Sequence, residues 1–266
     1  AFCVTLDDGG KLEEYKRTLN ELLKRVPKIS FFVTGKLRPD ILRYLRKQKG
    51  VELANHSYSH PFFRDIGYTD SKREILMAQS IIGKTAGFRF PFVNYTAYGI
   101  LALSELGYSY ESSIRVDHLN DFVGAIFPYN LVIAPCGVLE TVDILEISPV
   151  QGDWFFYGKI YDKPYSSKEL KESQQAFYSY LNTIWSIIKD AGGVMVQMGH
   201  PMYEGHSQEF LQPVLKFIDS LITQKDVWIT SLGELSDWWR KLKDVKVLVD
   251  EKGKSLTFRI LNPVSR

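Results

Sequence analysis

The segment Phe2-Cys3-Val4-Thr5-Leu6-Asp7-Asp8-Gly9-Gly10 decides the fold prediction. Its first five residues form an apolar run of strand length, and two carboxylates and two glycines follow directly. Adjacent carboxylates at the end of a buried strand are costly to desolvate unless a positive charge lies beside them. Glycine allows the backbone to come close to a ligand. The segment therefore predicts a buried strand that delivers two acidic side chains to a site.

A matching segment, Asn55-His56-Ser57-Tyr58-Ser59-His60, lies further along the chain. The spacing of four residues predicts that the two imidazoles lie on one face of a helical turn, a geometry suited to a divalent metal. One aspartate and two histidines form a three-ligand set with open coordination positions, which is typical of a catalytic metal site. The second carboxylate is then free to act as a base.

Composition limits the class of protein. The chain has 266 residues, of which 45% are hydrophobic and 24% charged, so we expect a soluble globular protein with a large core. This length fits two average domains or one α/β barrel. The net charge of +2 gives no reason to expect nucleic acid or a membrane surface as a partner. No apolar run of about 18 residues occurs, so no transmembrane segment is expected.

The start of the chain, its cysteines and two of its histidines give little information about fold or function. The chain starts at Ala1, without Met and already inside a predicted strand, so we expect a trimmed chain whose natural N-terminus is missing. Cys3 and Cys136 are too few for a disulfide framework, and Cys3 reads as a small core residue. The remaining histidines, His118 and His206, are assigned no role.

Strands and helices alternate at the start of the chain. Strands are predicted at 2–6, 29–33, 51–54 and 88–92, and helices at 12–26, 39–48 and 70–82. Four such alternations in the first hundred residues predict parallel βα units with right-handed crossovers, and so an α/β fold.

The remaining chain is less regular. Helices are predicted at 98–106, 168–189, 210–222 and 232–242, strand-like pieces at 131–133 and 142–147, and strands at 194–198 and 227–229. Segments 245–249 and 256–260 flank a glycine-containing loop and predict a β-hairpin. We therefore expect a catalytic barrel at 1–242 and a C-terminal hairpin appendage at 243–266.

Ionisable side chains collect where the predicted strands end. In a parallel barrel, these strand ends lie at the face that carries catalysis. The side chains are Asp7, Asp8, His56, His60, Arg89 and His200. Each motif alone also fits a structural role, such as a helix cap, a surface ion pair or a satisfied turn. Their joint occurrence favours a catalytic metal site.

The order of five motifs resembles the polysaccharide deacetylases, the NodB-homology group also known as carbohydrate esterase family 4. The motifs are Thr5-Leu6-Asp7-Asp8-Gly9, His56-Ser57-Tyr58-Ser59-His60, Arg89-Phe90-Pro91-Phe92, Asp153-Trp154 and Met198-Gly199-His200. This resemblance implies a distorted (β/α)7 barrel, similar to a TIM barrel but with seven units. It also implies metal-dependent removal of acetyl groups from N-acetylated sugars.

The resemblance implies a role for each residue of the motifs. Asp7 would be the catalytic base, held in its ionised form by Arg89, and Asp153 would pair with Arg89. His200 would be the general acid. The implied metal ligands are Asp8, His56 and His60.

The resemblance also implies three substrate contacts. The backbone N–H of Phe92 would polarise the carbonyl, Trp154 would form a wall of the pocket, and Met198 would line the slot for the acetyl methyl group. The sequence departs from the family pattern at Val93-Asn94-Tyr95, where glycine is usual, and at Pro149-Val150-Gln151, where an earlier aspartate is usual. Both departures fall on substrate-facing loops.

The expected cofactor is a divalent metal, with Zn²⁺ first and Co²⁺, Ni²⁺ or Mn²⁺ as alternatives. The expected partner is a carbohydrate substrate that contains N-acetylglucosamine. Alternatives are the same site acting on an O-acetyl ester or a non-sugar amide, and an inactive glycan-binding relative. Location stays open: the resemblance favours the cell envelope or secretion, the cytoplasm is an alternative, and the oligomeric state is unassigned.

Overall fold

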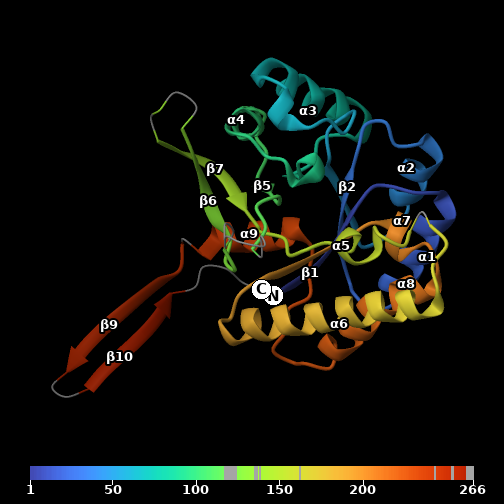
Figure 1. The fold of residues 1–266 in the computed structure, drawn as a ribbon. Helices are drawn as coiled ribbons and strands as arrows, with labels where there is room; N and C mark the ends of the chain where they lie inside the picture. Colours follow the sequence, from blue (N-terminus) through green and yellow to red (C-terminus); the bar gives the residue numbers. More distant parts are fainter. Residues whose placement is uncertain are drawn as a thin grey trace.

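The computed structural model of the chain describes residues 1–116, 125–134, 137, 139–161, 163–242, 244–252 and 255–261. A curled sheet lies at the centre, with helices on its outer side (Figure 1). Cys136 and His118 lie outside the described residues. Cys3 is a free, buried thiol, as expected.

The sheet is built almost entirely from parallel strands. In spatial order they are β8 (Met195–Gly199), β1 (Phe2–Asp7), β2 (Ile29–Val33), β3 (Val51–Asn55), β4 (Gly87–Phe88), β5 (Tyr110–Glu111) and β7 (Glu140–Glu146). A parallel bridge between Pro149, just after β7, and Val196 of β8 joins the two ends of this row. Seven parallel strands among the described residues thus form a ring, which confirms the predicted distorted barrel.

One strand runs the other way. β6 (Tyr129–Ile133) pairs antiparallel with β7 at the outer edge of the sheet. Sequence analysis predicted both as strand-like pieces but not their pairing.

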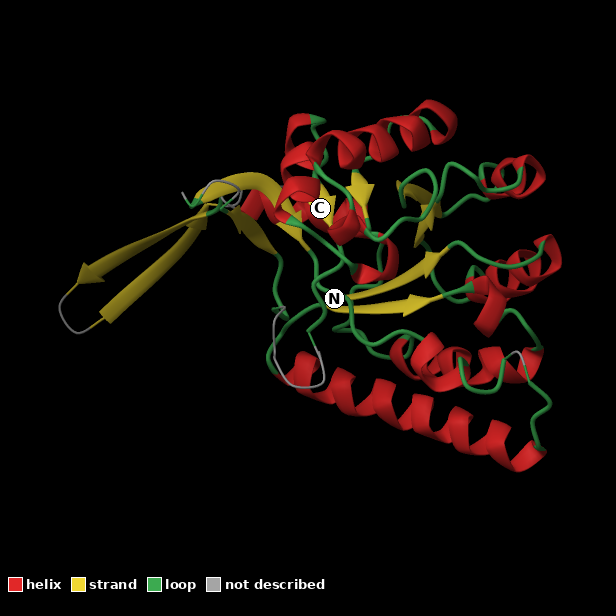
Figure 2. Cartoon of the chain, turned by 45° about the horizontal axis from the view of Figure 1, so that its top comes forward, coloured by secondary structure: helices red, strands yellow, loops and turns green. Residues whose placement is uncertain are grey.

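Helices cover the outer side of the barrel (Figures 1 and 2). The α-helices are α1 (Leu12–Leu22), α2 (Pro39–Leu45), α3 (Tyr68–Ile82), α4 (Ala97–Glu105), α5 (Trp154–Tyr157), α6 (Ser167–Asp190), α7 (Pro201–Glu204), α8 (Gln208–Leu221) and α9 (Leu232–Leu242). Two short 3₁₀ helices, η1 (Phe63–Asp65) and η2 (Pro91–Val93), follow β3 and β4. α6 matches the helix predicted at 168–189. A capping box stabilises its start, in which the side chains of Ser166 and Glu169 each accept the backbone N–H of the other residue.

Side chains on the two faces of each strand enter different cores. On β1, Phe2, Val4 and Leu6 pack against the surrounding helices, while Cys3 points to the barrel interior with Phe32 of β2. This alternation follows from the two-residue period of a strand. Both faces are buried, which is why the strand reads as one continuous apolar run.

Two predicted strands are shorter in the structure. The strand predicted at 88–92 ends at Phe88, since Pro91 cannot donate a ladder hydrogen bond and the φ of Phe92 is 58°. The segment predicted at 227–229 forms only a single bridge, between Ile229 and Phe2.

The C-terminal hairpin is confirmed as secondary structure. β9 (Lys246–Lys252) and β10 (Ser255–Leu261) pair antiparallel with each other and project away from the barrel (Figures 1 and 2). Its division from the barrel as a separate domain stays a prediction. Among the described residues, no helix has both the length and the apolar character needed to cross a membrane.

Candidate functional site

The strand register brings the predicted site residues to one rim. Asp7 is the last residue of β1 and pairs with Phe32 of β2. Asn55, one residue before His56, pairs with Phe88, one residue before Arg89. On the other side of β1, Leu6 pairs with Gly199, one residue before His200. The carboxyl ends of four parallel strands therefore present these groups together, as expected.

Asp7 and Arg89 form a fully enclosed ion pair. Arg89 has no exposed surface, and its Nη1 donates to Asp7 Oδ1 at 2.6 Å and to Thr5 Oγ1 at 3.0 Å. Its Nε and Nη2 donate to the carbonyl and hydroxyl of Ser112, and its guanidinium lies 4.1 Å from the ring centre of Phe32. Burial alone would raise the pKa of Asp7, but Arg89 and two nearby histidines lower it below its ordinary value. Asp7 is therefore held as a carboxylate.

The predicted pairing of Asp153 with Arg89 is wrong, because Asp153 binds His200. Its Oδ1 lies 2.7 Å from His200 Nδ1 and its Oδ2 accepts the His200 backbone N–H at 2.7 Å. Both groups come from segments next to β8, whereas the guanidinium of Arg89 donates to Asp7, Thr5 and Ser112. Burial opposes the charged ring, yet Asp153 raises the pKa of His200 above its ordinary value. The other ring nitrogen, Nε2, lies 4.0 Å from Asp7 Oδ2.

His56 and His60 meet as predicted, but not on a helical turn. Their ring centres are 5.0 Å apart, on a loop in which Ser57 and His60 have φ of 71° and 60°. These residues with left-handed backbone conformation turn the loop back on itself. The two rings therefore meet without the regular helical backbone that the spacing of four suggested. Glu74 of α3 holds this loop by accepting the backbone N–H groups of Tyr58 and Ser59.

The His56 ring has a defined tautomer. Its Nδ1 donates to the carbonyl of Arg89 at 2.7 Å, so Nε2 carries the lone pair and lies 4.0 Å from Asp7 Oδ2. Burial lowers the pKa of His56 to about 3, which keeps the ring neutral. A neutral imidazole oriented by a carbonyl is the usual form of a metal-binding histidine.

Asp8 is held by Thr34, the residue that follows β2. Its Oδ2 accepts the Thr34 hydroxyl at 2.5 Å and the Thr34 backbone N–H at 3.0 Å. Burial raises the pKa of Asp8 to about 6 in spite of these two hydrogen bonds. Across the part of the chain that the structure describes, no three His, Cys, Asp or Glu side chains form a ready group for an ion. The ligand set Asp8, His56 and His60 thus stays a prediction.

Two of the predicted substrate contacts lie next to each other. A Cβ added to Gly152 would lie 2.9 Å from the methyl carbon of Met198 and 3.0 Å from the indole of Trp154. Met198 is buried, whereas Trp154 is 43% exposed at the start of α5. The arrangement fits an apolar floor beside an accessible aromatic wall.

Phe92 lies on the opposite side, next to His60. Its ring is 4.4 Å from the ring centre of His60 and stacks on Phe62 at 4.1 Å, with both phenylalanines about half exposed. This places Phe92 at the rim. The role of its backbone N–H stays a prediction.

Several residues that hold the site were missed from the sequence. Thr34, Ser112 and Glu74 are polar residues outside the motifs, and Thr5 begins the first motif but was assigned no role; each acts through a partner far away in the chain. The only available signal was a polar residue within an otherwise apolar strand, as at Thr5.

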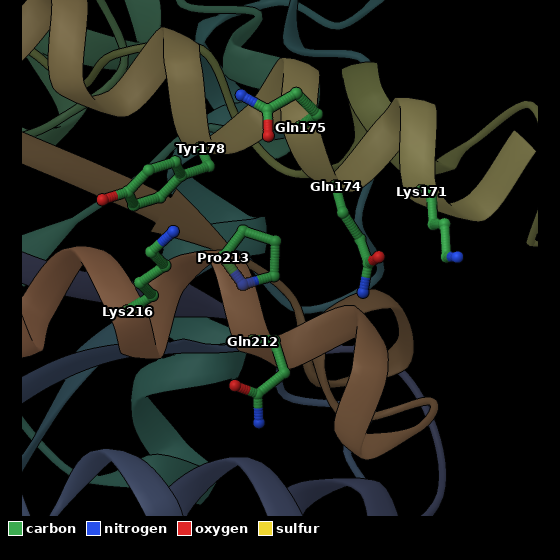
Figure 3. A pocket seen from close by; sticks show the side chains of 7 residues that line it. All are labelled: Lys171, Gln174, Gln175, Tyr178, Gln212, Pro213 and Lys216. Carbon is green, nitrogen blue, oxygen red and sulfur yellow. The ribbon is translucent and has the colours of Figure 1, made fainter. Parts of the chain in front are cut away.

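A cavity of about 440 Å³ lies elsewhere, between α6 and α8 on the outside of the barrel (Figure 3). Its lining contains lysine, glutamine, tyrosine and proline, and no acid or histidine; the residues are Lys171, Gln174, Gln175, Tyr178, Gln212, Pro213 and Lys216. This cavity therefore lacks the carboxylate and imidazole side chains that the rim brings together.

Sequence comparisons agree with the motifs. The family model for polysaccharide deacetylase matches residues 1–110. A peptidoglycan-N-acetylglucosamine deacetylase from Bacillus cereus is 26% identical over 116 residues, 42% of this chain and 42% of that protein. The peptidoglycan-N-acetylmuramic acid deacetylase PdaC from Bacillus subtilis is 33% identical over 89 residues, 32% of this chain and 19% of that protein. The matches thus cover less than half of each relative.

Solved structures share the fold over most of the chain. A protein from Mycobacterium smegmatis assigned to the polysaccharide deacetylases has a TM-score of 0.69 at 18% identity, covering 91% of this chain and 90% of that one. A family 4 carbohydrate esterase from Streptomyces lividans in complex with acetate has a TM-score of 0.51 at 18% identity, covering 86% and 90%. The allantoinase PuuE has a TM-score of 0.65 at 15% identity, covering 90% and 89%.

The fold, the motif order and the comparisons agree. The sequence match covers the first 110 residues, and the likeness to solved structures over most of the chain is one of fold. Residues 1–110 of this chain match the polysaccharide deacetylase family, and the chain as a whole shares its fold with solved structures assigned to that family.

Proposed function

We propose that the protein is a metal-dependent hydrolase that removes acetyl groups from N-acetylated sugars in a polysaccharide or oligosaccharide. One observation carries the proposal: the carboxylate of Asp7 lies between a fixed cation, Arg89, and two imidazoles whose ring nitrogens are each 4.0 Å from its second oxygen. A base, an acid and a candidate metal ligand thus surround one small volume. Metal-dependent hydrolysis of amides and esters uses this combination.

The residues present fit a divalent metal by their chemistry. One carboxylate and two imidazoles, Asp8, His56 and His60, suit Zn²⁺ and leave coordination positions open. His56 supports this choice, because its Nδ1 hydrogen bond turns the lone pair of Nε2 toward the rim. A bound metal would supply an acidified water molecule and polarise the substrate carbonyl.

Asp7 is suited to accept a proton. Arg89 keeps it ionised, and its Oδ2 is not used by the Arg89 hydrogen bond, which goes to Oδ1. In the proposed reaction this oxygen takes the proton of the attacking water.

His200 is suited to donate a proton. Asp153 binds its Nδ1 and raises its pKa, so Nε2–H remains available near neutral pH. Because an amine is a poor leaving group unless it is protonated, we propose that His200 Nε2 protonates the nitrogen of the sugar as the amide bond breaks.

The two sides of the rim would bind the substrate. Met198 and Trp154 would receive the acetyl methyl group over Gly152, and the backbone N–H of Phe92 would stabilise the developing oxyanion. The two Bacillus relatives, which act on peptidoglycan, support an amino-sugar polymer as substrate. The likeness to an allantoinase favours a second candidate, a small non-sugar amide.

The experiment is acetate release by the metal-stripped protein after addition of Zn²⁺, Co²⁺, Ni²⁺ or Mn²⁺. Substrates are N-acetylglucosamine oligomers, peptidoglycan fragments, acetylated xylan and allantoin, the last followed by ring opening. We expect metal-dependent acetate release from the amino-sugar substrates. Hydrolysis of allantoin alone would favour a non-sugar amide as substrate, and hydrolysis of acetylated xylan alone would favour an O-acetyl ester. Glycan binding without any turnover would indicate an inactive relative.

A further inference from the structure

Two buried glutamates lie behind the site and take no part in the chemistry above. Glu111 ends β5 and Glu146 ends β7, and the two are paired in register across these neighbouring strands. Neither side chain has exposed surface. Both oxygens of Glu111 and Oε2 of Glu146 lack a hydrogen bond of good geometry, and the two carboxyls interact with each other and with Ser113. Glu146 Oε1 accepts the backbone N–H of Ile114 at 3.0 Å.

Two neighbouring carboxylates cannot both be charged in such a place. Burial penalises each charge, and the repulsion between them adds to that penalty. One shared proton removes a charge and gives these oxygens a donor and an acceptor. The charged or titratable groups that face the pair are Arg89, Tyr95 and Tyr129. The hydrogen bonds of Arg89 go to Asp7, Thr5 and Ser112, and none goes to either glutamate.

The pair adjoins the stretch that holds Arg89. The carbonyl and hydroxyl of Ser112 accept from Arg89, and the Ser113 hydroxyl accepts the backbone N–H of Phe90 at 2.9 Å. The next residue, Ile114, is held by Glu146 itself. Residues 112–114 therefore connect the glutamates to both residues that follow β4.

We propose that Glu111 and Glu146 share one proton and act as a positioning pair, which fixes residues 112–114 and through them the guanidinium of Arg89 against Asp7. The link to catalysis rests on the proposed function. The shared proton does not, because it follows from the burial, the register and the contact of the two carboxyls alone.

The shared proton can be tested without measuring enzyme activity. Infrared spectra should contain a protonated-carboxyl band at neutral pH that decreases in the Glu111→Gln/Glu146→Gln variant. The folded protein then keeps the shared proton at a pH where the unfolded chain, whose glutamates have a pKa of about 4.3, has already released it. Stability of the wild type should therefore fall as pH rises above about 4.3, and more steeply than that of the double variant, until the folded protein also releases the shared proton. An identical band and identical melting slopes in both proteins would overturn the shared proton.

The positioning role is tested by comparing two substitutions at one residue. Glu146→Gln keeps an oxygen for the Ile114 N–H and an NH₂ donor toward Glu111, so kcat should stay within about threefold. Glu146→Ala removes that acceptor, so kcat should fall by about tenfold or more while KM changes less than about twofold. Glu140→Ala, on the exposed start of the same strand, is the matched control and should resemble the wild type.

Equal losses in Glu146→Gln and Glu146→Ala would overturn the positioning role, since the amide preserves the shape and the hydrogen bonds. If Glu146→Ala does not fold, the Gln variant still decides: a loss of kcat beyond about tenfold contradicts the role. A wild type inactive on all substrates, but with the infrared band and the melting slope as expected, would contradict only the proposed function.

Discussion

Asp7 and Asp153 lie at the same barrel mouth and are both buried, yet they have opposite partners. Asp7 is paired with Arg89, a group that keeps its charge at every relevant pH. Asp153 is paired with His200, a group that titrates near neutrality. A permanent cation fixes the charge of the carboxylate, whereas a carboxylate beside an imidazole changes the charge of the imidazole.

The difference indicates which group takes the proton and which gives it. The pKa of Asp7 is lowered and that of His200 is raised, so a base and an acid coexist over a range of pH between the two values. The two pairs face each other across 4.0 Å, from Asp7 Oδ2 to His200 Nε2. We therefore expect the ionisation of Asp7, beside Arg89, to set the acidic limb of the pH profile of activity. The ionisation of His200, beside Asp153, should set the alkaline limb.

The largest effect is expected from Asp7→Asn. The amide cannot accept the proton of the attacking water, so kcat should fall by about 10²–10⁴-fold. Because Asp8, His56 and His60 are unchanged, bound metal measured by atomic emission should stay at the wild-type level. Loss of the metal in this variant would mean that the roles of base and ligand are exchanged.

Arg89→Gln removes the fixed cation and should be next in size. Breaking a fully buried pair costs about 3–5 kcal/mol of stability, which chemical denaturation measures. The remaining burial raises the pKa of Asp7, and since Asp7 must be ionised, the acidic limb of kcat/KM should move to higher pH. If the acidic limb did not move, the ionisation of Asp7 would not be what sets it.

Asp153→Asn sharpens the comparison from the other side. Without the carboxylate, burial dominates and lowers the pKa of His200. The ring must be protonated to act as an acid, so the alkaline limb should move down by about one pH unit or more, while the acidic limb stays in place. If both limbs moved together, the two pairs would not titrate separately.

Much of this site follows from the sequence because strand ends are local features. The apolar run 2–6 predicts where β1 ends, and the parallel arrangement then brings Asp7, His56, Arg89 and His200 to one rim. The amphipathic period of α6 and the loop between β9 and β10 are equally local.

Partner choice was not predictable in the same way. Whether Asp153 binds Arg89 or His200 depends on the pairing of residues 149–153 with β8, which no local pattern contains. The contact of His56 with His60 depends on left-handed residues, and the spacing of four suggested a helix instead. The pairing of Glu111 with Glu146 depends on β5 lying beside β7, although the residues are far apart in the chain.

The smallest effect is expected from Glu74→Gln, which tests the loop that carries His56 and His60. The amide retains an oxygen acceptor but loses the charge that strengthens the two backbone hydrogen bonds. Metal affinity, measured by competition with a chelator, should fall by about tenfold or less, because supporting residues typically contribute about 10–100-fold when they are removed entirely. Exposed Glu172 on α6 provides a matched control as Glu172→Gln.

The central claim is that Asp8, His56 and His60 bind one cation while Asp7 remains free as the base. Anomalous diffraction from crystals grown with Zn²⁺ tests it most directly. We predict one peak within about 2.0–2.2 Å of a carboxylate oxygen of Asp8 and a ring nitrogen of each histidine. A peak bound by Asp7 instead of Asp8, or a site elsewhere on the barrel with this rim empty, would contradict the account.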